Sequence, residues 1–362
     1  MAISTKVIMV GPFQKGDDFR GISSVLSSYF TYNKFKGYYI DYVATSHRGN
    51  VNLKIIALGI SLVRYTFKLL FTNTKIVHIH TADFRSFPRK GLYVLLAYIF
   101  RKKIILHIHG AQFREFYTSS SKMLRALISK ILDLADTIIV LSEFWLKYFQ
   151  TITITPNIRI LFNPVDGAGF DSRPHDYSKK TKDVLYMTML YARKGIYDLL
   201  EAIPIVIGAE PSARFLLCGE GDIAKCRNIC KEKGIIDNVK FCGYVTGQAK
   251  IDKLFNADIF VLPTHFEGFP ISMIEAMFNG LPIITTPVGG IPDVFVDGVN
   301  GFLVQPGDVE NIANRLIRLL KDTSLRKKMG EKNANRAREL FDVNVVMKKL
   351  CQLYKETLEL QS

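Results

Sequence analysis

The sequence predicts an α/β protein of two doubly wound, Rossmann-like domains that face each other across a cleft. Its 362 residues suffice for two or three domains of ordinary size. The strand candidates are short, continuous runs rich in β-branched residues, which is typical of parallel strands buried on both faces. These strands alternate with helical stretches, and the alternation restarts after a polar connection at residues 164–182.

The first half contains six strand candidates, in the order KVIMVG, YYIDYVAT, KIVHIH, KIILHIHG, TIIVLS and IRILFN. Helical stretches separate them, notably residues 54–71, 90–100 and 122–134. Because a strand that returns parallel to its predecessor needs a crossover, this alternation predicts a parallel sheet with helices on both faces.

The second half repeats the pattern with the strand candidates DVLYMTM, ARFLLCG, NVKFCG, DIFVLP and LPIITT. From Asp308 onward only helical periodicity remains. We therefore expect a first domain at 1–163, onto which a terminal helix at about 344–362 packs back, and a second domain at 164–343. Ligands of such sheets bind at the carboxyl ends of the strands, so the chemistry is expected there.

The composition excludes several classes of protein. With 48% hydrophobic and 22% charged residues the chain is neither disordered nor collagen-like. Its longest apolar runs, at 55–63 and 92–100, are far shorter than the ~20 residues that span a bilayer. The five cysteines contain no CxxC pair, so neither a disulfide framework nor a zinc finger is indicated. We expect an unexported chain in a reducing cytoplasm.

The net charge of +15 is unevenly distributed. Residues 1–165 hold 22 Lys and Arg against 8 Asp and Glu, whereas residues 166–362 hold 26 against 25. This asymmetry predicts that the first half binds a polyanion or an anionic membrane surface. Several of these cations flank apolar helices: Lys54, Arg64, Lys68, Arg89, Lys90, Arg101, Lys102 and Lys103. Alternatively, they are only solvated helix faces.

Residues 258–301 are the segment richest in candidate chemistry. A buried strand ends at Pro263, a polar loop carries Glu267, and Pro270 suits the first turn of a helix in which Glu275 follows. The unpaired amides at Gly268–Ser272 would form a helix N-terminus, which favours a diphosphate. The alternative is that both glutamates are solvated charges.

The same residues resemble the retaining GT-B glycosyltransferases of the group 1, or family 4, type. That family includes bacterial phosphatidylinositol mannosyltransferases, lipopolysaccharide and capsule sugar transferases, and sucrose synthase. The similarity rests on Glu267 and Glu275, the run EAMFNGLP, the loop Val288–Gly290 and the GxxG of residues 298–301. Further counterparts are VHIH (77–80), HIHG (107–110), VLSE (140–143), NPVD (163–166), RKG (193–195), CGEG (218–221) and FCGYV (241–245).

The resemblance implies a role for each candidate site residue. Glu275 would bind the donor ribose, Glu267 would hold the donor sugar, and Lys194 would neutralise the diphosphate. His109 would touch the transferred sugar. The other implied donor-binding residues are Gly21, Gly268, Phe269, Pro270, Ile271, Gly243 and Val245.

The chain departs from the family at two positions. The family places an arginine five residues before the lysine, where this chain has Met189. Either Lys194 and helix amides carry the diphosphate largely alone, or another basic side chain substitutes. The family's glycine pair before the first helix is reduced to Gly21, since Arg20 stands in the other place. Without the resemblance, Lys194 would pass for a surface lysine and Gly21 for part of an ordinary turn.

Two His-x-His pairs end neighbouring strand candidates, His78 with His80 and His107 with His109. Residues i and i+2 share one face of a strand, so four imidazoles are in principle able to ligate a metal ion. No carboxylate or cysteine completes such a site, and we expect instead that histidines at strand ends hydrogen bond to the backbone. No metal site is assigned.

We therefore expect a hexosyltransferase-type enzyme that moves a sugar, with retention, from a nucleotide-diphosphate donor to a lipid-linked glycan acceptor in bacterial surface polysaccharide synthesis. It would need no metal ion or other cofactor, bind no nucleic acid, and work as a cytoplasmic protein, peripheral at the anionic inner face of the plasma membrane. The alternatives are a catalytically silent nucleotide-sugar-binding subunit, a GT-B epimerase or phosphorylase, and a basic nucleic-acid-binding protein, although interleaved aromatic and basic residues on a sheet are not seen.

Overall fold

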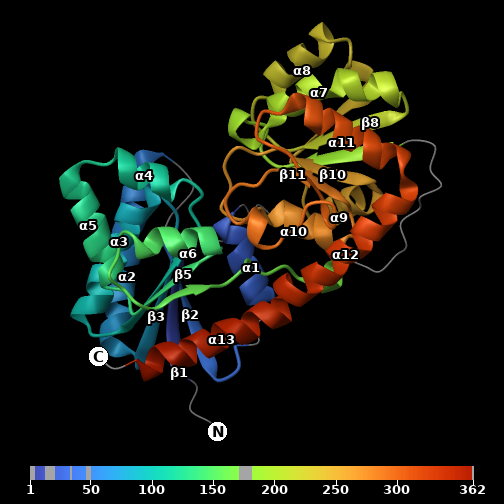
Figure 1. Cartoon of the computed structure of the whole chain (residues 1–362). Helices are drawn as coiled ribbons and strands as arrows, with labels where there is room; N and C mark the ends of the chain where they lie inside the picture. The colour runs from blue at the N-terminus through green and yellow to red at the C-terminus, as the bar shows by residue number, and fades with distance from the viewer. Residues whose placement is uncertain (1–4, 13–20, 33–34, 46–49, 171–181, 361–362) are drawn as a thin grey trace. The chain divides into compact units, whose positions relative to one another are not determined.

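The computed structural model describes residues 5–12, 21–32, 35–45, 50–170 and 182–360. The chain divides into two compact units, one formed by Met1–Pro164 with Val343–Ser362 and the other by Val165–Asp342. Each unit contains a six-stranded sheet whose strands are all parallel, flanked by helices (Figure 1). The predicted α/β class with two doubly wound sheets is confirmed.

The first unit has the strand order β2-β1-β3-β4-β5-β6. All six strands predicted from the first half are present. They are β1 (Thr5–Gly11), β2 (Tyr38–Ala44), β3 (Thr74–Thr81), β4 (Lys103–Ile108), β5 (Thr137–Val140) and β6 (Ile158–Ile160). The helices are α1 (Ile22–Tyr32), α2 (Val51–Phe71), α3 (Ser86–Ile99), α4 (Phe113–Ser119), α5 (Lys122–Asp133), α6 (Glu143–Gln150) and α13 (Val343–Glu359).

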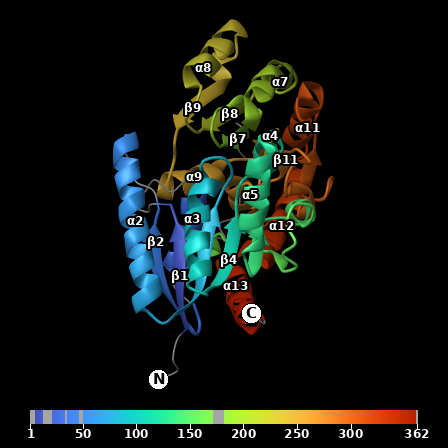
Figure 2. The same ribbon diagram turned by 90° about the vertical axis from the view of Figure 1, so that its left-hand side faces the viewer.

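The helices of the first unit cover both faces of its sheet. Helices α2, α3 and α5 lie side by side over one face (Figure 2). Val77 and Ile79 of β3 point into the apolar core on that side. The alternate residues of β3 point to the other face, where His80 meets the ring of Tyr29 on α1 and His78 meets Tyr354 on α13. Burial on both faces explains why these strands are continuously apolar.

The second unit has the order β12-β11-β10-β7-β8-β9. Its strands are β7 (Lys182–Met187), β8 (Ala213–Cys218), β9 (Val239–Gly243), β10 (Ile259–Leu262), β11 (Ile283–Thr285) and β12 (Gly301–Leu303). Its helices are α7 (Ile196–Ala209), α8 (Ile223–Glu232), α9 (Gly247–Asn256), α10 (Ile271–Phe278), α11 (Val309–Lys321) and α12 (Thr323–Phe341). Four 3-10 turns lie at Gly167–Gly169, Ala192–Lys194, Ile236–Asn238 and Ile291–Asp293.

Strand β12 was not predicted. It has only three residues and begins with Gly301, so it carries neither the length nor the β-branched run of a strand signal. Its pairing with β11 places it in the sheet. None of the helices in the described ranges is both long and apolar enough to cross a membrane.

Candidate functional site

The strand order of the second unit places a topological switch point between β7 and β10. From β7 the chain proceeds to β8 and β9 on one side, whereas β10, β11 and β12 lie on the other. In open parallel sheets the crevice at such a point, beyond the carboxyl ends of the strands, is where ligands bind. The loops that leave β7 and β10 carry Lys194 and Glu267, so both lie at this edge of the sheet.

Backbone and hydroxyl contacts hold these two loops together. The carbonyl of Arg193 accepts hydrogen bonds from the amide of His265, at 2.9 Å, and from Oγ1 of Thr264, at 3.1 Å. The hydroxyl of Tyr186, on β7, lies within hydrogen-bonding distance of the carbonyl oxygens of Met189 and Lys194. Gly195 completes the junction, because it has φ of +71° and a Cβ there would lie 1.8 Å from the carbonyl oxygen of Pro263. The two loops therefore form one packed platform at this edge of the sheet.

Lys194 and Glu267 form an ion pair on this platform. The Nζ atom of Lys194 contacts Oε1 of Glu267, and the two side chains are only 12% and 7% exposed. The interpretation of Glu267 as a solvated loop charge and of Lys194 as a surface lysine is therefore wrong. A buried carboxylate held by one lysine places opposite charges side by side at the edge of the sheet where ligands bind.

Helix α10 follows directly, with Pro270 as its N-cap residue and Ile271 as its first residue. The first amides of a helix have no acceptor within it, so this end carries partial positive charge. Gly268 and Phe269 lead into it, and the carbonyl of Gly268 accepts from the amide of Gly290 at 3.0 Å. A Cβ on the neighbouring Gly289, which has φ of +56°, would lie 1.9 Å from the carbonyl oxygen of Glu267. The glycine loop at 288–290 thus packs against the loop that carries Glu267.

Glu275 lies in the second turn of α10 and is 7% exposed. Its carboxylate accepts from Nζ of Lys250, on α9. Sequence reasoning missed Lys250, because no motif marks it and 25 residues separate it from its partner. Lys250 is a second basic side chain beside the helix that carries the predicted ribose contact, and so a candidate for the cation that Met189 does not supply.

Met189 and Arg193 themselves supply no cation to the pair. Met189 is half-buried, and its carbonyl accepts from Tyr186. Arg193 has an exposed side chain, and it enters the platform through its carbonyl. Gly243 is the last residue of β9 and Val245 follows it; β9 is the edge strand of the sheet and lies two strands away from β7.

His109 and Gly21 belong to the first unit. Gly21 is exposed, has φ of +53°, and its carbonyl accepts from the amide of Ser24 in the first turn of α1. Arg20 lies outside the described residues. His109 follows β4 and is half-buried; its Nε2 lies 2.9 Å from Nδ1 of His80, and the side chain of Asn163 also hydrogen bonds to it.

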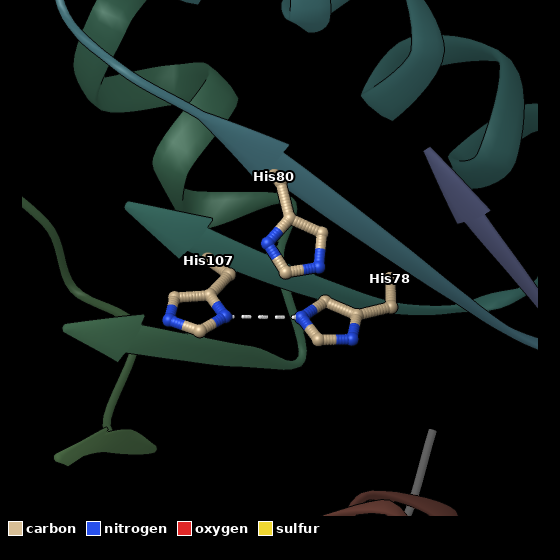
Figure 3. A group of neighbouring side chains, drawn as sticks. All are labelled: His78, His80 and His107. Carbon is tan, nitrogen blue, oxygen red and sulfur yellow. Dashed lines mark hydrogen bonds between the residues drawn. The ribbon is translucent and has the colours of Figure 1, made fainter. Parts of the chain in front are cut away.

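His78 and His80 of β3, His107 of β4 and His109 just after β4 form one cluster, and Figure 3 shows the first three. They bond to one another rather than to the backbone, which corrects the expectation from the sequence. His78 Nε2 lies 3.3 Å from His107 Nδ1, and His78 Nδ1 lies 2.8 Å from the hydroxyl of Tyr354. Burial lowers the pKa of His78 and that of His109 to about 3, so both rings are neutral.

A metal ion is a poor fit for this cluster. One ring nitrogen from each of His78, His80 and His107 lies within 4.8 Å of the others. The rings of His78 and His107 are within 7° of parallel, and those of His78 and His80 within 30°. Lone pairs lie in the plane of each ring, so stacked rings do not direct them at one point, as a tetrahedral ion demands. The contacts present are those of a hydrogen-bonded network.

Two units, each with a doubly wound parallel sheet, give this protein the GT-B glycosyltransferase fold. In solved structures the same fold extends over almost the whole chain. The structure of Anabaena HepE in complex with UDP and glucose matches 97% of this chain and 99% of its own, with a TM-score of 0.76 and 16% identity. Sucrose-phosphate synthase from Thermosynechococcus elongatus matches 97% of this chain and 98% of its own, with a TM-score of 0.78 and 18% identity.

Residues 169–336, which make up most of the second unit, match the family described as glycosyl transferases group 1. One similar protein is N-acetyl-alpha-D-glucosaminyl L-malate synthase of Bacillus anthracis, 26% identical over 79% of this chain and 76% of its own length. Another is the capsular polysaccharide glycosyltransferase CapM of Staphylococcus aureus, 28% identical over 48% of this chain and 46% of its own. A GDP-mannose-dependent mannosyltransferase of Corynebacterium glutamicum is 31% identical over 57% of this chain and 58% of its own length.

Proposed function

We propose that this protein is a retaining glycosyltransferase that transfers a hexose from a nucleotide-diphosphate sugar to a lipid-linked glycan acceptor in bacterial surface polysaccharide synthesis. The observation that supports this proposal most is the buried pair of Lys194 and Glu267 at the switch point of the second sheet. It lies beside the N-terminus of α10, within the residues that match the group 1 family.

Each part of the site has a place in this reaction. The bond from the sugar C1 to the diphosphate oxygen breaks, and a bond from C1 to the acceptor hydroxyl oxygen forms on the same face. The hydroxyl proton passes to the departing phosphate oxygen. Lys194 and the amides of α10 stabilise charge on the diphosphate, and Glu267 holds the sugar. Because these groups already oppose the developing charges, the proposed mechanism needs no metal ion or other cofactor.

The donor assignment makes a direct prediction. Glu275→Ala should weaken donor binding roughly ten- to hundredfold, because a charged acceptor for ribose hydroxyls is lost. Binding is measured as the rise in melting temperature with increasing UDP-glucose or GDP-mannose, since a ligand that binds only the folded state stabilises it more as the ligand concentration exceeds Kd. Glu232→Ala, at the exposed end of α8, is the matched control and should bind as the wild type does. Equal shifts in both variants would remove Glu275 from the donor site.

The first unit carries an unusual apolar surface that supports a membrane-bound acceptor. On α2 the side chains of Val63, Phe67 and Phe71 are 71%, 60% and 69% exposed. The other exposed apolar side chains on α2, α3 and α5 are Val51, Leu53, Ile55, Ile56, Ile60, Leu70, Leu92, Leu95, Tyr98, Ile99, Met123 and Leu127. A soluble monomer rarely exposes so many large apolar side chains on neighbouring helices. We call it the α2 face.

The charges around the α2 face favour an anionic membrane as its partner. Neither α2 nor α3 contains an aspartate or glutamate, and Lys54, Arg64 and Arg101 are exposed. The sequence-based set of cations needs correction, however. Lys90 is 2% exposed, Lys68 pairs with Asp41, and Lys103 pairs with Asp136. The proposed contact therefore combines apolar insertion with a smaller set of cations, at the cytoplasmic inner face of the plasma membrane.

The membrane contact predicts a particular pattern of vesicle binding. Sedimentation with phosphatidylcholine vesicles containing anionic phosphatidylglycerol should capture the protein, and salt should reduce capture. Replacing Arg101 by Asn, which tolerates its φ of +50°, together with Lys102→Gln should weaken partitioning roughly tenfold or more, at ~1 kcal/mol for each charge.

Two further variants separate the apolar and ionic contributions. Phe67→Gln with Phe71→Gln should weaken binding at every salt concentration, because the insertion is apolar. The control, Lys327→Gln with Lys328→Gln, removes the same charge from exposed positions of α12 and should bind normally. Capture that is equal on neutral vesicles, or absent on anionic ones at low salt, would favour a soluble acceptor instead.

A second candidate function is a catalytically silent nucleotide-sugar-binding subunit. Met189 favours it, because the arginine expected at this position of the diphosphate site is missing. Release of UDP or GDP from the sugar nucleotides that raise the melting temperature would distinguish an enzyme from a silent binder.

A further inference from the structure

The imidazole network of the first unit contains an asymmetry that the proposed reaction does not explain. In the part of the chain that the structure describes, Nε2 of His80 and Nε2 of His107 are buried and have no hydrogen-bond partner. Both rings are 0% exposed. The Nδ1 atom of each ring does have a partner, His109 for His80 and His78 for His107.

This asymmetry restricts where the proton of His80 lies. A neutral imidazole carries one N–H, and a buried N–H without an acceptor is rarer than a bare acceptor. If His109 donated from Nε2, His80 would have to accept at Nδ1 and bury its Nε2–H unpaired. If His80 donates from Nδ1, only a lone pair remains unpaired. The second arrangement satisfies the network better.

The same proton count determines the state of His109. Since its Nε2 accepts from His80, its own proton must lie on Nδ1 as long as the ring is neutral. Burial lowers the pKa of His109 to about 3, which keeps it neutral at physiological pH. The side chain of Asn163 also hydrogen bonds to this ring.

We propose that His80 is a positioning residue, which donates Nδ1–H to Nε2 of His109 and so holds His109 as the neutral Nδ1–H tautomer in one fixed orientation. This role rests on the proposed function, in which His109 meets the sugar. The ring centroids of His78 and His107 lie 4.3 Å and 4.9 Å from that of His80, and burial lowers the pKa of His80 well below its usual range (Figure 3). His80 therefore acts as a fixed neutral donor, not as an acid or base.

The tautomer is measurable without any substrate. The full chain labelled with ¹⁵N-histidine contains seven imidazoles, and two-bond ¹H–¹⁵N correlations distinguish Nδ1–H from Nε2–H rings. The signals that disappear in His80→Asn and in His109→Asn identify the two rings. Both should be Nδ1–H in the wild type near pH 7.5. An Nε2–H signal for His109 would overturn the proposal, whatever the activity.

Substitutions at His80 test whether its hydrogen bond to His109 affects turnover. Asparagine places an amide N–H near the position of Nδ1, glutamine places one near Nε2, and leucine offers none. Initial rates of release of UDP from UDP-glucose, or of GDP from GDP-mannose, give kcat and KM. His80→Asn should keep most of kcat, whereas His80→Gln and His80→Leu should lose roughly tenfold with little change in KM. Equal losses in all three, at equal melting temperature, would leave His80 with a packing role only.

The outcomes remain distinct from failure of the proposed function. If the wild type releases no nucleotide but His109 is the Nδ1–H tautomer that His80→Leu abolishes, the network stands and the enzymatic proposal fails. Stoichiometric zinc in the purified chain that is lost in His107→Asn would show that the ring nitrogens are metal ligands. That result would overturn the hydrogen-bonded arrangement.

Discussion

Lys194→Met should lower turnover by roughly ten- to hundredfold, the largest loss expected from a single change in this protein. The substitution keeps most of the side-chain volume but removes the only cation that contacts Glu267 among the described residues. Two effects add, since the departing diphosphate loses a fixed charge and Glu267 loses the partner that orients it. Initial rates of nucleotide release from UDP-glucose or GDP-mannose measure the change.

The neighbouring arginine is the matched control for this prediction. Arg193 is exposed and enters the site through its carbonyl, so Arg193→Met should retain near wild-type rates. Because a buried carboxylate without its cation costs ~3 kcal/mol or more, melting temperatures must accompany the rates. Met189→Arg in the Lys194→Met background should recover part of the loss. Normal rates in Lys194→Met would show that the diphosphate binds elsewhere.

Acidification should unfold the first unit at a higher pH than it would unfold a similar unit without buried histidines. Burial lowers the pKa of His78 to about 3, and burial lowers the pKa values of His80 and His107 well below their usual range. The unfolded chain binds these protons below pH ~6.5, whereas the folded chain does not. Their contribution to stability is therefore complete above pH ~6.5 and declines as the pH falls toward 3.

For His78 alone this linkage amounts to ~2 kcal/mol between pH 7.5 and pH 5. The chain has a single tryptophan, Trp145, buried in the core of the first unit, so its fluorescence in urea reports the unfolding of that unit. His78→Asn keeps an amide near Nδ1 to meet Tyr354 and should reduce the difference in unfolding free energy between the two pH values by about that amount. The control His265→Asn lies in the second unit and should not alter the signal. An unchanged difference in His78→Asn would contradict the linkage.

The strands illustrate how much of the fold the local sequence predicts. Runs such as KVIMVG and TIIVLS are mostly apolar because helices cover both faces of each sheet and bury successive residues of the strand. Both the α/β class and the place where the alternation restarts follow from this one effect. Strand β12 has three residues and begins with glycine, and only its pairing with β11 makes it a strand.

The site residues divide in the same way. Glu267 and Glu275 are recognisable from their spacing and the EAMFNGLP run, because a loop-to-helix junction is a local feature of the chain. Their partners are not local. Lys194 is 73 residues from Glu267, and no periodicity connects Lys250 with Glu275. Whether the two glutamates are solvated or buried in ion pairs therefore depended on strand order and helix packing.

The histidines show most clearly what the sequence alone cannot predict. The sequence by itself determined that two His-x-His pairs share the faces of two parallel strands, since side chains alternate along a strand. It also determined the basic character of the first half and the family resemblance of the second. Only the tertiary structure decided that β3 pairs with β4, and that Tyr354, 276 residues from His78, covers this face. The proton positions, the low pKa values and the network follow from that burial, because desolvation and hydrogen bonding act through space and not along the chain.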